Sequence, residues 1–166
     1  MSNSAVSTVD SLLIGDIQDW VSTLPQYQGD LIKQMLTSQS PEEVAISWLT
    51  SSGPADTAPF GAIRAGASLY YINLLRELQK LLCGNTEYQE ERKTLATLSS
   101  TSKLAIVSLI STAIAPNVGG AAVVIAPVVT IALGLLASAG RSTACEALDT
   151  AITNQIPTDS TDSKQQ

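Results

Sequence analysis

The sequence contains no histidine, and aromatic residues make up only 4% of it. Without histidine, the chain lacks the commonest general base and metal ligand of proteins. It also lacks the phosphate-binding patterns GxGxxG and GxxxxGK[ST] and the GxSxG pattern of serine hydrolases. The paired acids Asp16 and Asp19 have no accompanying Glu-x-x-His motif, so they indicate a solvated helix face. We therefore predict no enzyme activity, no bound metal and no cofactor, and we identify no small-molecule substrate.

Cysteine is also scarce, because the chain holds only Cys83 and Cys145, neither of them in a CxxC pattern. Two thiols cannot build a disulfide-rich scaffold, so we expect both to be free and buried in a reducing compartment. Residues 1–10 have neither the basic region nor the apolar region of a signal peptide. The resulting expectation is a cytoplasmic protein, with association to a membrane left open.

Charged residues make up only 14% of the chain, and its net charge is −6 with a sequence pI of about 4.4. An acidic protein repels nucleic acid, whose phosphates require Lys and Arg. Acids outnumber bases in residues 1–60, whereas bases outnumber acids in residues 61–103. Two interpretations stay open here: ordinary solvated faces, or an acidic front that packs against a basic middle. Nucleic acid is excluded as a predicted partner in either case.

The longest absence of charge runs from Leu104 to Gly140. Because an ionised group loses its hydration at large cost in an apolar medium, such a segment is either buried in a core or inserted into a membrane. Turn-forming residues interrupt it, and they predict a hairpin of two apolar helices. The residues assigned to the turn are Pro116, Asn117, Gly119 and Gly120.

Apolar residues at helical spacing predict helices over about 13–24, 29–38, 62–82, 86–115, 121–139 and 142–152. One more helix begins at Ser40-Pro41-Glu42-Glu43, a capping-box pattern. The predicted fold is all-α, a bundle of five to seven helices enclosing a central hydrophobic hairpin at about 104–140. The expected organisation is a disordered N-terminus (1–7), acidic N-terminal helices (8–53), a Pro/Gly linker (54–61), a helical core with the hairpin (62–153) and a disordered polar tail (154–166).

The length of the two arms limits how the hairpin can meet a bilayer. A hydrocarbon core of about 30 Å needs roughly 20 helical residues, so the first arm is too short to cross alone and the second could just cross. Three architectures therefore compete: a soluble core hairpin, a shallow or re-entrant membrane hairpin, and a single crossing by the second arm. Lys103 and Arg141 would anchor the ends to anionic headgroups. The residues predicted to insert are Leu109, Ile110, Ile114, Val124, Val129, Ile131 and Leu135.

This plan resembles, in architecture alone, helical toxins and death-regulating proteins that hide a hydrophobic hairpin until they meet a membrane. The resemblance implies a non-enzymatic, membrane-active effector or regulator that is released by a trigger, a protein partner or oligomerisation, and it carries no site residues. The alternative is a soluble all-α interaction module or homo-oligomer with the hairpin as its permanent core. Its candidate partner-binding residues are Trp20, Trp48, Tyr70 and Tyr71.

Overall fold

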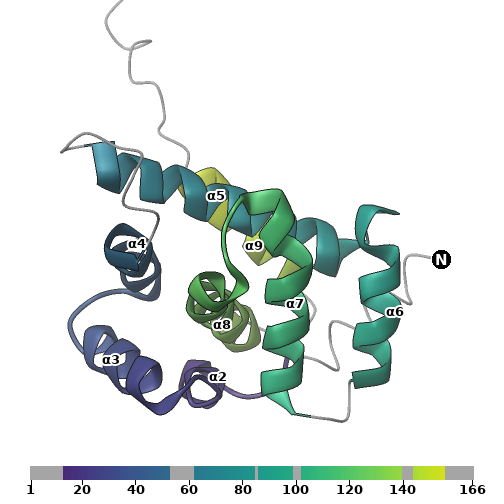
Figure 1. Ribbon diagram of the computed structural model, residues 1–166, viewed down its shortest axis with the longest axis horizontal. Helices are drawn as coiled ribbons and strands as arrows, with labels where there is room; N and C mark the ends of the chain where they lie inside the picture. The colour runs from purple at the N-terminus through teal and green to yellow at the C-terminus, as the bar shows by residue number, and fades with distance from the viewer. Residues whose placement is uncertain (1–12, 53–61, 85, 99–101, 140–143, 156–166) are drawn as a thin grey trace, which may run out of the picture.

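The computed structural model describes residues 13–52, 62–84, 86–98, 102–139 and 144–155. Within these ranges the secondary structure is entirely helical, which confirms the all-α prediction (Figure 1). The described α-helices number eight, with one short 3-10 helix, so the predicted range of five to seven was too low. The helices are α2 (Ile17–Val21), α3 (Gln26–Leu36), α4 (Pro41–Ser52), α5 (Ala62–Cys83), η1 (Thr86–Tyr88), α6 (Gln89–Leu98), α7 (Lys103–Val118), α8 (Ala122–Ala139) and α9 (Ala144–Gln155).

The central element of the fold is α8, which Figure 1 shows nearly end-on between the other helices. It contacts α2, α4, α7 and α9, while α5 packs on α4, α7 and α9. The eight consecutive residues 127–134 are all buried, so no side of this stretch of α8 faces solvent. An apolar helix without a polar face is stable only when every side is covered. The uncharged composition of α8 therefore matches its position in the middle of the bundle.

The additional helix arises because the expected continuous helix over 86–115 is two helices, α6 and α7. The Ser102 hydroxyl accepts a hydrogen bond from the Ala105 amide at 3.3 Å and caps the N-terminus of α7. A side-chain oxygen at this position satisfies one of the exposed amides of a new helix. The sequence predicted that the polar Ser-Thr-Ser stretch before Lys103 lies inside a continuous helix. In the structure, Ser102 at the end of this stretch caps the start of α7.

Two reciprocal capping boxes position the N-terminal helices. At α4, the Ser40 amide donates to Glu43 Oε2 at 3.0 Å and the Glu43 amide donates to Ser40 Oγ at 3.3 Å, as the sequence predicts. At α2, Asp16 and Asp19 make the same exchange at 3.0 and 2.9 Å. Both acids are exposed, as expected of a solvated helix face, and they also start a helix that is much shorter than predicted.

The N-terminal helices and the later helices share one hydrophobic core, because α2 and α4 pack directly on α8. The predicted N-terminus (1–7) and linker (54–61) lie outside the described residues, as does most of the predicted tail. The tail was expected from residue 154, but α9 extends to Gln155.

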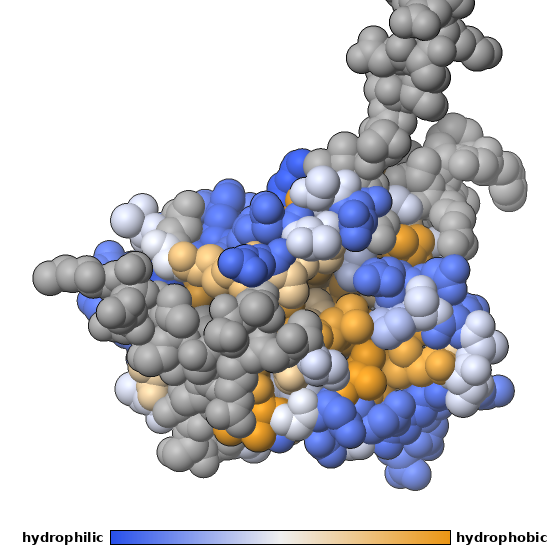
Figure 2. Space-filling view, turned by 180° about the vertical axis from the view of Figure 1, so that it is seen from behind, coloured by the Kyte–Doolittle hydropathy of each residue, from blue (hydrophilic) through white to orange (hydrophobic). Residues whose placement is uncertain are grey.

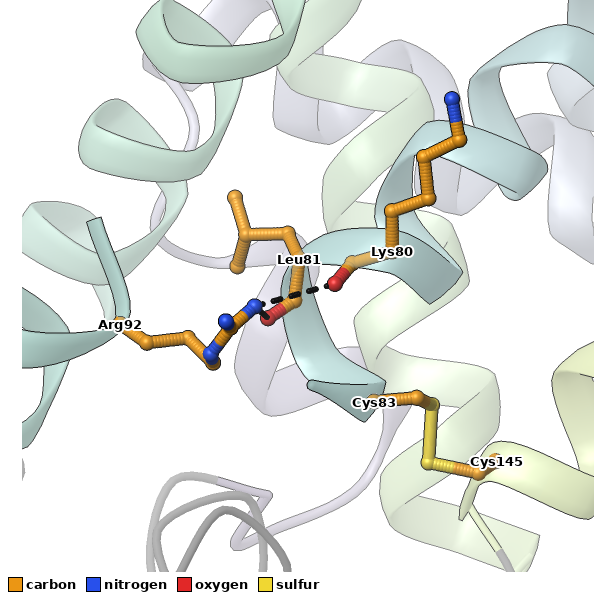
Figure 3. Close-up of a disulfide and its surroundings, with 5 residues drawn as sticks. All are labelled: Lys80, Leu81, Cys83, Arg92 and Cys145. Carbon is orange, nitrogen blue, oxygen red and sulfur yellow. Dashed lines mark hydrogen bonds between the residues drawn. A yellow bond between two sulfur atoms is a disulfide. The ribbon is translucent and has the colours of Figure 1, made fainter. Parts of the chain in front are cut away.

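The two cysteines form a disulfide, so the prediction of free thiols was wrong (Figure 3). Cys83 ends α5 and Cys145 lies in the first turn of α9, with their Cα atoms 6.0 Å apart. A second contact closes the same end of α5, where Arg92 Nη1 of α6 donates to the carbonyl oxygens of Lys80 and Leu81, each at 3.1 Å. Sequence spacing could not predict the pairing because only the packing of α5 on α9 brings residues 83 and 145 together.

Candidate functional site

The candidate site is the apolar pair, which we define as α7 and α8. Four of the residues predicted to insert into a membrane, Ile110, Ile114, Val129 and Ile131, have no exposed surface. The other three, Leu109, Val124 and Leu135, are half-buried. The structure therefore brings six of the seven into or against the protein core, and the side chain of Val124 is only partly covered.

The turn between the two helices is shorter than predicted. Gly119 adopts a left-handed conformation with φ 77°, which ends α7, while Pro116 and Asn117 lie inside the last turns of that helix. Two of the four predicted turn residues are thus helical, because the αL cap that glycine adopts readily sets the helix end. The pair bends by 115° at this break. An antiparallel hairpin is therefore not confirmed, although the two helices do contact each other.

Gly134 allows α2 to lie directly against α8. A Cβ atom placed on Gly134 would lie 2.8 Å from Ile17 Cα and 3.1 Å from Ile17 Cβ. No residue other than glycine fits this approach without movement of one of the helices. The close packing of α2 on this part of α8 therefore depends on the absence of a side chain at Gly134.

Trp48 joins α4 to the apolar pair through a polar contact. Its indole Nε1 donates to the Val124 carbonyl oxygen at 3.0 Å. Pro127 lacks an amide, but the helical acceptor that loses its donor is the carbonyl four residues earlier, that of Val123, and not that of Val124. The indole therefore adds one polar contact between α4 and α8. Sequence reasoning placed Trp48 among candidate anchors for an outside partner, but its partner here is α8.

Trp48→Phe is expected to lower the free energy of unfolding by about 0.5–1.5 kcal/mol, because it removes one part-buried hydrogen bond between α4 and α8. Trp20→Phe is the matched control. Trp20 is also buried, but among the described residues its Nε1 has no hydrogen-bond partner, so this change removes no bond. Chemical denaturation of both variants measures the difference. An equal loss in the two variants would show that the Trp48 indole contributes only its volume.

Lys103, a predicted headgroup anchor, contacts α2, one of the helices that pack on the apolar pair. Its ammonium nitrogen lies 5.6 Å from the centroid of the Trp20 ring on α2, within the range of a cation–π interaction. The contact ties the start of α7 to α2. The other predicted anchor, Arg141, lies outside the described residues.

Polar side chains of α5 and η1 form hydrogen bonds at the C-terminal end of α7, where the apolar pair bends. Asn117 Nδ2 donates to the Tyr88 hydroxyl oxygen at 2.6 Å, and that hydroxyl donates to Glu77 Oε2 at 2.5 Å. Glu77 also pairs with Lys80 at 3.1 Å, and Lys80 lies 3.4 Å from Glu87. Sequence analysis missed this network because its members are far apart in the chain. The only available signal was a polar Asn117 at the end of an apolar segment.

We expect stability to fall as pH rises above the ordinary tyrosine pKa of 10.0. Burial raises the pKa of Tyr71, with a further contribution from Glu42, and burial together with the Glu77 hydrogen bond raises the pKa of Tyr88. A pKa raised in the folded state gives stability that is complete below the unfolded-state pKa and is lost as pH rises above it. Thermal midpoints between about pH 8 and about pH 11 should therefore decline less in Tyr71→Phe/Tyr88→Phe than in wild type. Tyr27→Phe, at an exposed position, should follow wild type.

Two of the remaining candidate partner residues, Trp20 and Tyr71, are buried. Tyr70 is half-buried, and its hydroxyl lies where a side chain on Gly120 would be. The binding of an outside partner by these aromatic residues stays a prediction.

Within the described residues, no single helix combines the length and the apolar composition needed to span a membrane. The segments Lys103–Val118 and Ala122–Ser138 meet that requirement only jointly, across their bend. No cluster of three or more metal-ligating side chains occurs in the same part of the chain.

Comparison of the chain with models of protein families, with curated proteins and with solved structures found no match.

Proposed function

We propose that the protein is a non-enzymatic, membrane-active effector or regulator whose apolar pair is sheltered in a closed form and inserts into a bilayer when released. The observation that carries this proposal is α8, a helix of 18 residues without a charge, enclosed by separate helices that each make a specific contact with it. Transfer of apolar surface from a protein core to lipid keeps it away from water, so insertion conserves most of the hydrophobic free energy.

The hydroxyl groups of α8 do not oppose this transfer. Thr130 Oγ1 donates to the Ala126 carbonyl at 2.7 Å, and Ser138 Oγ donates to the Gly134 carbonyl at 2.9 Å. Polar groups in lipid must be satisfied within the protein, and these two are satisfied within their own helix. The bend between α7 and α8 favours a shallow or re-entrant insertion.

In this proposal, α2 and α4 are the helices that detach from the apolar pair. On one side, the disulfide fastens α9 to α5. On the other side, α2 and α4 are held by non-covalent contacts, among them Lys103 with Trp20 and Trp48 with Val124. The buried Trp20 Nε1 lacks a hydrogen-bond partner among the described residues, and an unsatisfied donor costs about 1–3 kcal/mol. Opening is therefore proposed to begin with α2 and α4.

The proposal is tested by sedimentation with anionic lipid vesicles. Under conditions in which wild type binds, Val124→Glu and Leu135→Lys should abolish binding, because a charge in the hydrocarbon region costs about 2.5–3.5 kcal/mol. Leu69→Glu is the control, since Leu69 is 59% exposed and lies on α5, outside the apolar pair. A thermal midpoint close to that of wild type confirms folding for each variant. Equal binding by all four proteins would contradict insertion of the pair.

The alternative is a soluble interaction module in which the apolar pair is a permanent core. The complete burial of residues 127–134 favours it. Folded wild type that stays in the supernatant at every vesicle concentration, even when α2 is displaced by substitution, would support this alternative.

The cytoplasmic location expected from the sequence stays a prediction. The disulfide weighs against a reducing compartment, since disulfides persist mainly in oxidising environments.

A further inference from the structure

Two adjoining hollows lie where α9 meets α4 and α8. Both are lined by Glu42 at the start of α4 and by Ala147 and Ala151 of α9. Figure 2 shows the face of the molecule on which α9 lies, with apolar atoms open to solvent between two bands of hydrophilic atoms. The hollows are formed by side chains of α4, α8 and α9 together with Tyr71 and Leu75 of α5.

The inner hollow has the size and lining of a pocket for one apolar side chain. Its volume is about 170 Å³, and apart from Glu42 it is lined by apolar and aromatic side chains. An apolar cavity of about 150 Å³ is large enough to bind a benzene ring. The lining residues besides the three shared ones are Tyr71, Leu75, Ala132, Leu135, Leu136 and Leu148.

The outer hollow is larger, at about 380 Å³, and its walls carry two carboxylates, Glu42 and Glu146. Neither carboxylate forms an ion pair with any other described residue. Glu42 also contributes to the raised pKa of Tyr71, which places its charge beside the inner pocket. An apolar pocket next to two carboxylates that have no ion-pair partner among the described residues is complementary to a cationic amphipathic surface.

The geometry points to a docking site for a cationic amphipathic helix of a partner protein, with an apolar side chain in the inner pocket and Lys or Arg residues between Glu42 and Glu146. The described part of the chain offers no free helix of this kind. Among its described helices, only α5 combines several basic residues with an apolar face, and that face lies in the core. The segment 157–166 carries more acids than bases and no large apolar residue.

A partner helix docked here would contact both α4 and α9, and under the proposed function α4 moves away from α9 when the protein opens. Glu42 belongs to α4, one of the helices that detach, whereas α9 is fastened to α5 by the disulfide. A bound helix would hold α4 against α9 and favour the closed form. The docking itself needs no bilayer, so its test and the vesicle test can fail independently.

The experiment uses the full-length oxidised protein and a labelled synthetic 18-residue peptide, with leucines at positions i, i+3, i+4 and i+7 and lysines on the opposite face. Fluorescence anisotropy at low salt should detect saturable binding that weakens as salt screens the charges. Two peptides serve as controls: one with glutamate in place of lysine, and one with the same composition but a scrambled order. Neither should bind.

Variants locate the site. Glu42→Gln/Glu146→Gln should weaken binding about fivefold, whereas Glu90→Gln/Glu91→Gln on α6 should change it less than about twofold. Ala151→Trp, which fills the groove, should weaken binding by about tenfold or more. If this variant folds poorly, Thr150→Trp replaces it, because Thr150 is exposed.

Three results would overturn the proposal. One is the absence of saturable binding by the cationic peptide, and another is equal weakening by the Glu42/Glu146 and Glu90/Glu91 variants. The third comes from sedimentation: self-association of wild type that Ala151→Trp abolishes would show that the occupant is a second copy of this chain.

Discussion

Gly134→Val is expected to lower the free energy of unfolding by about 3 kcal/mol and to displace α2 from α8. The first added carbon alone would lie 2.8 Å from Ile17 Cα and 2.9 Å from Ile17 Cγ1. Because the nearest obstacle is backbone rather than the end of a flexible side chain, the strain cannot be relieved by a rotamer change, and overpacking of this kind costs about 1–3 kcal/mol or more. Chemical denaturation measures the loss, and hydrogen exchange of the α2 amides measures the displacement.

The matched control is Gly66→Ala on α5, where an added Cβ meets no atom within 4 Å. That change should stabilise the protein by about 0.5–1 kcal/mol, since alanine is the better helix former. Under the proposed function, Gly134→Val should also bind anionic vesicles more strongly than wild type, because it uncovers α8. A variant as stable as wild type, with unchanged α2 exchange, would refute the close approach of α2 and α8.

Reduction of the Cys83–Cys145 disulfide is expected to destabilise the protein by about 4 kcal/mol, because the bond closes a long loop in the unfolded chain. The two cysteines are 62 residues apart, and the segment between them contains α6, α7 and α8. For a chain of this size the loss corresponds to a fall in thermal midpoint of roughly 10 °C. The measurement compares the oxidised protein with and without a thiol reductant.

The control is Cys83→Ser/Cys145→Ser, which should melt like the reduced wild type and should not respond to the reductant. Since α5 and α9 still pack against each other without the bond, we expect the variant to fold. A wild-type midpoint that is insensitive to the reductant would show that the crosslink contributes nothing to stability.

Local signals predicted much of the secondary structure. The start of α4 at Ser40-Pro41 follows from side chains within one turn of the helix. The helix predicted over about 62–82 ends within one residue of that position, at Cys83, and it is followed by Gly84 with φ 98°, the left-handed conformation that glycine adopts readily. These features depend on neighbouring residues alone, which is why the sequence is sufficient to locate them.

The candidate site was predicted less completely. The uncharged segment indicated where the buried helices lie, but not which helices cover them. The roles of Trp48, Lys103 and Asn117 depend on partners that are tens of residues away, and no local pattern indicates such partners. Gly134 lies within the helix predicted over 121–139, yet no local pattern names α2 as the helix that packs on it.

By itself the sequence determined that the chain is helical and that most of the uncharged segment 104–140 is to be kept from water, because hydrophobic periodicity and the absence of charge are local properties. Only the tertiary structure decided that α8 lies in the centre under α2 and α4, and that Cys83 meets Cys145. The physical reason is that apolar burial is non-directional: it requires that the segment be covered, but it does not specify by which helices or at what angle.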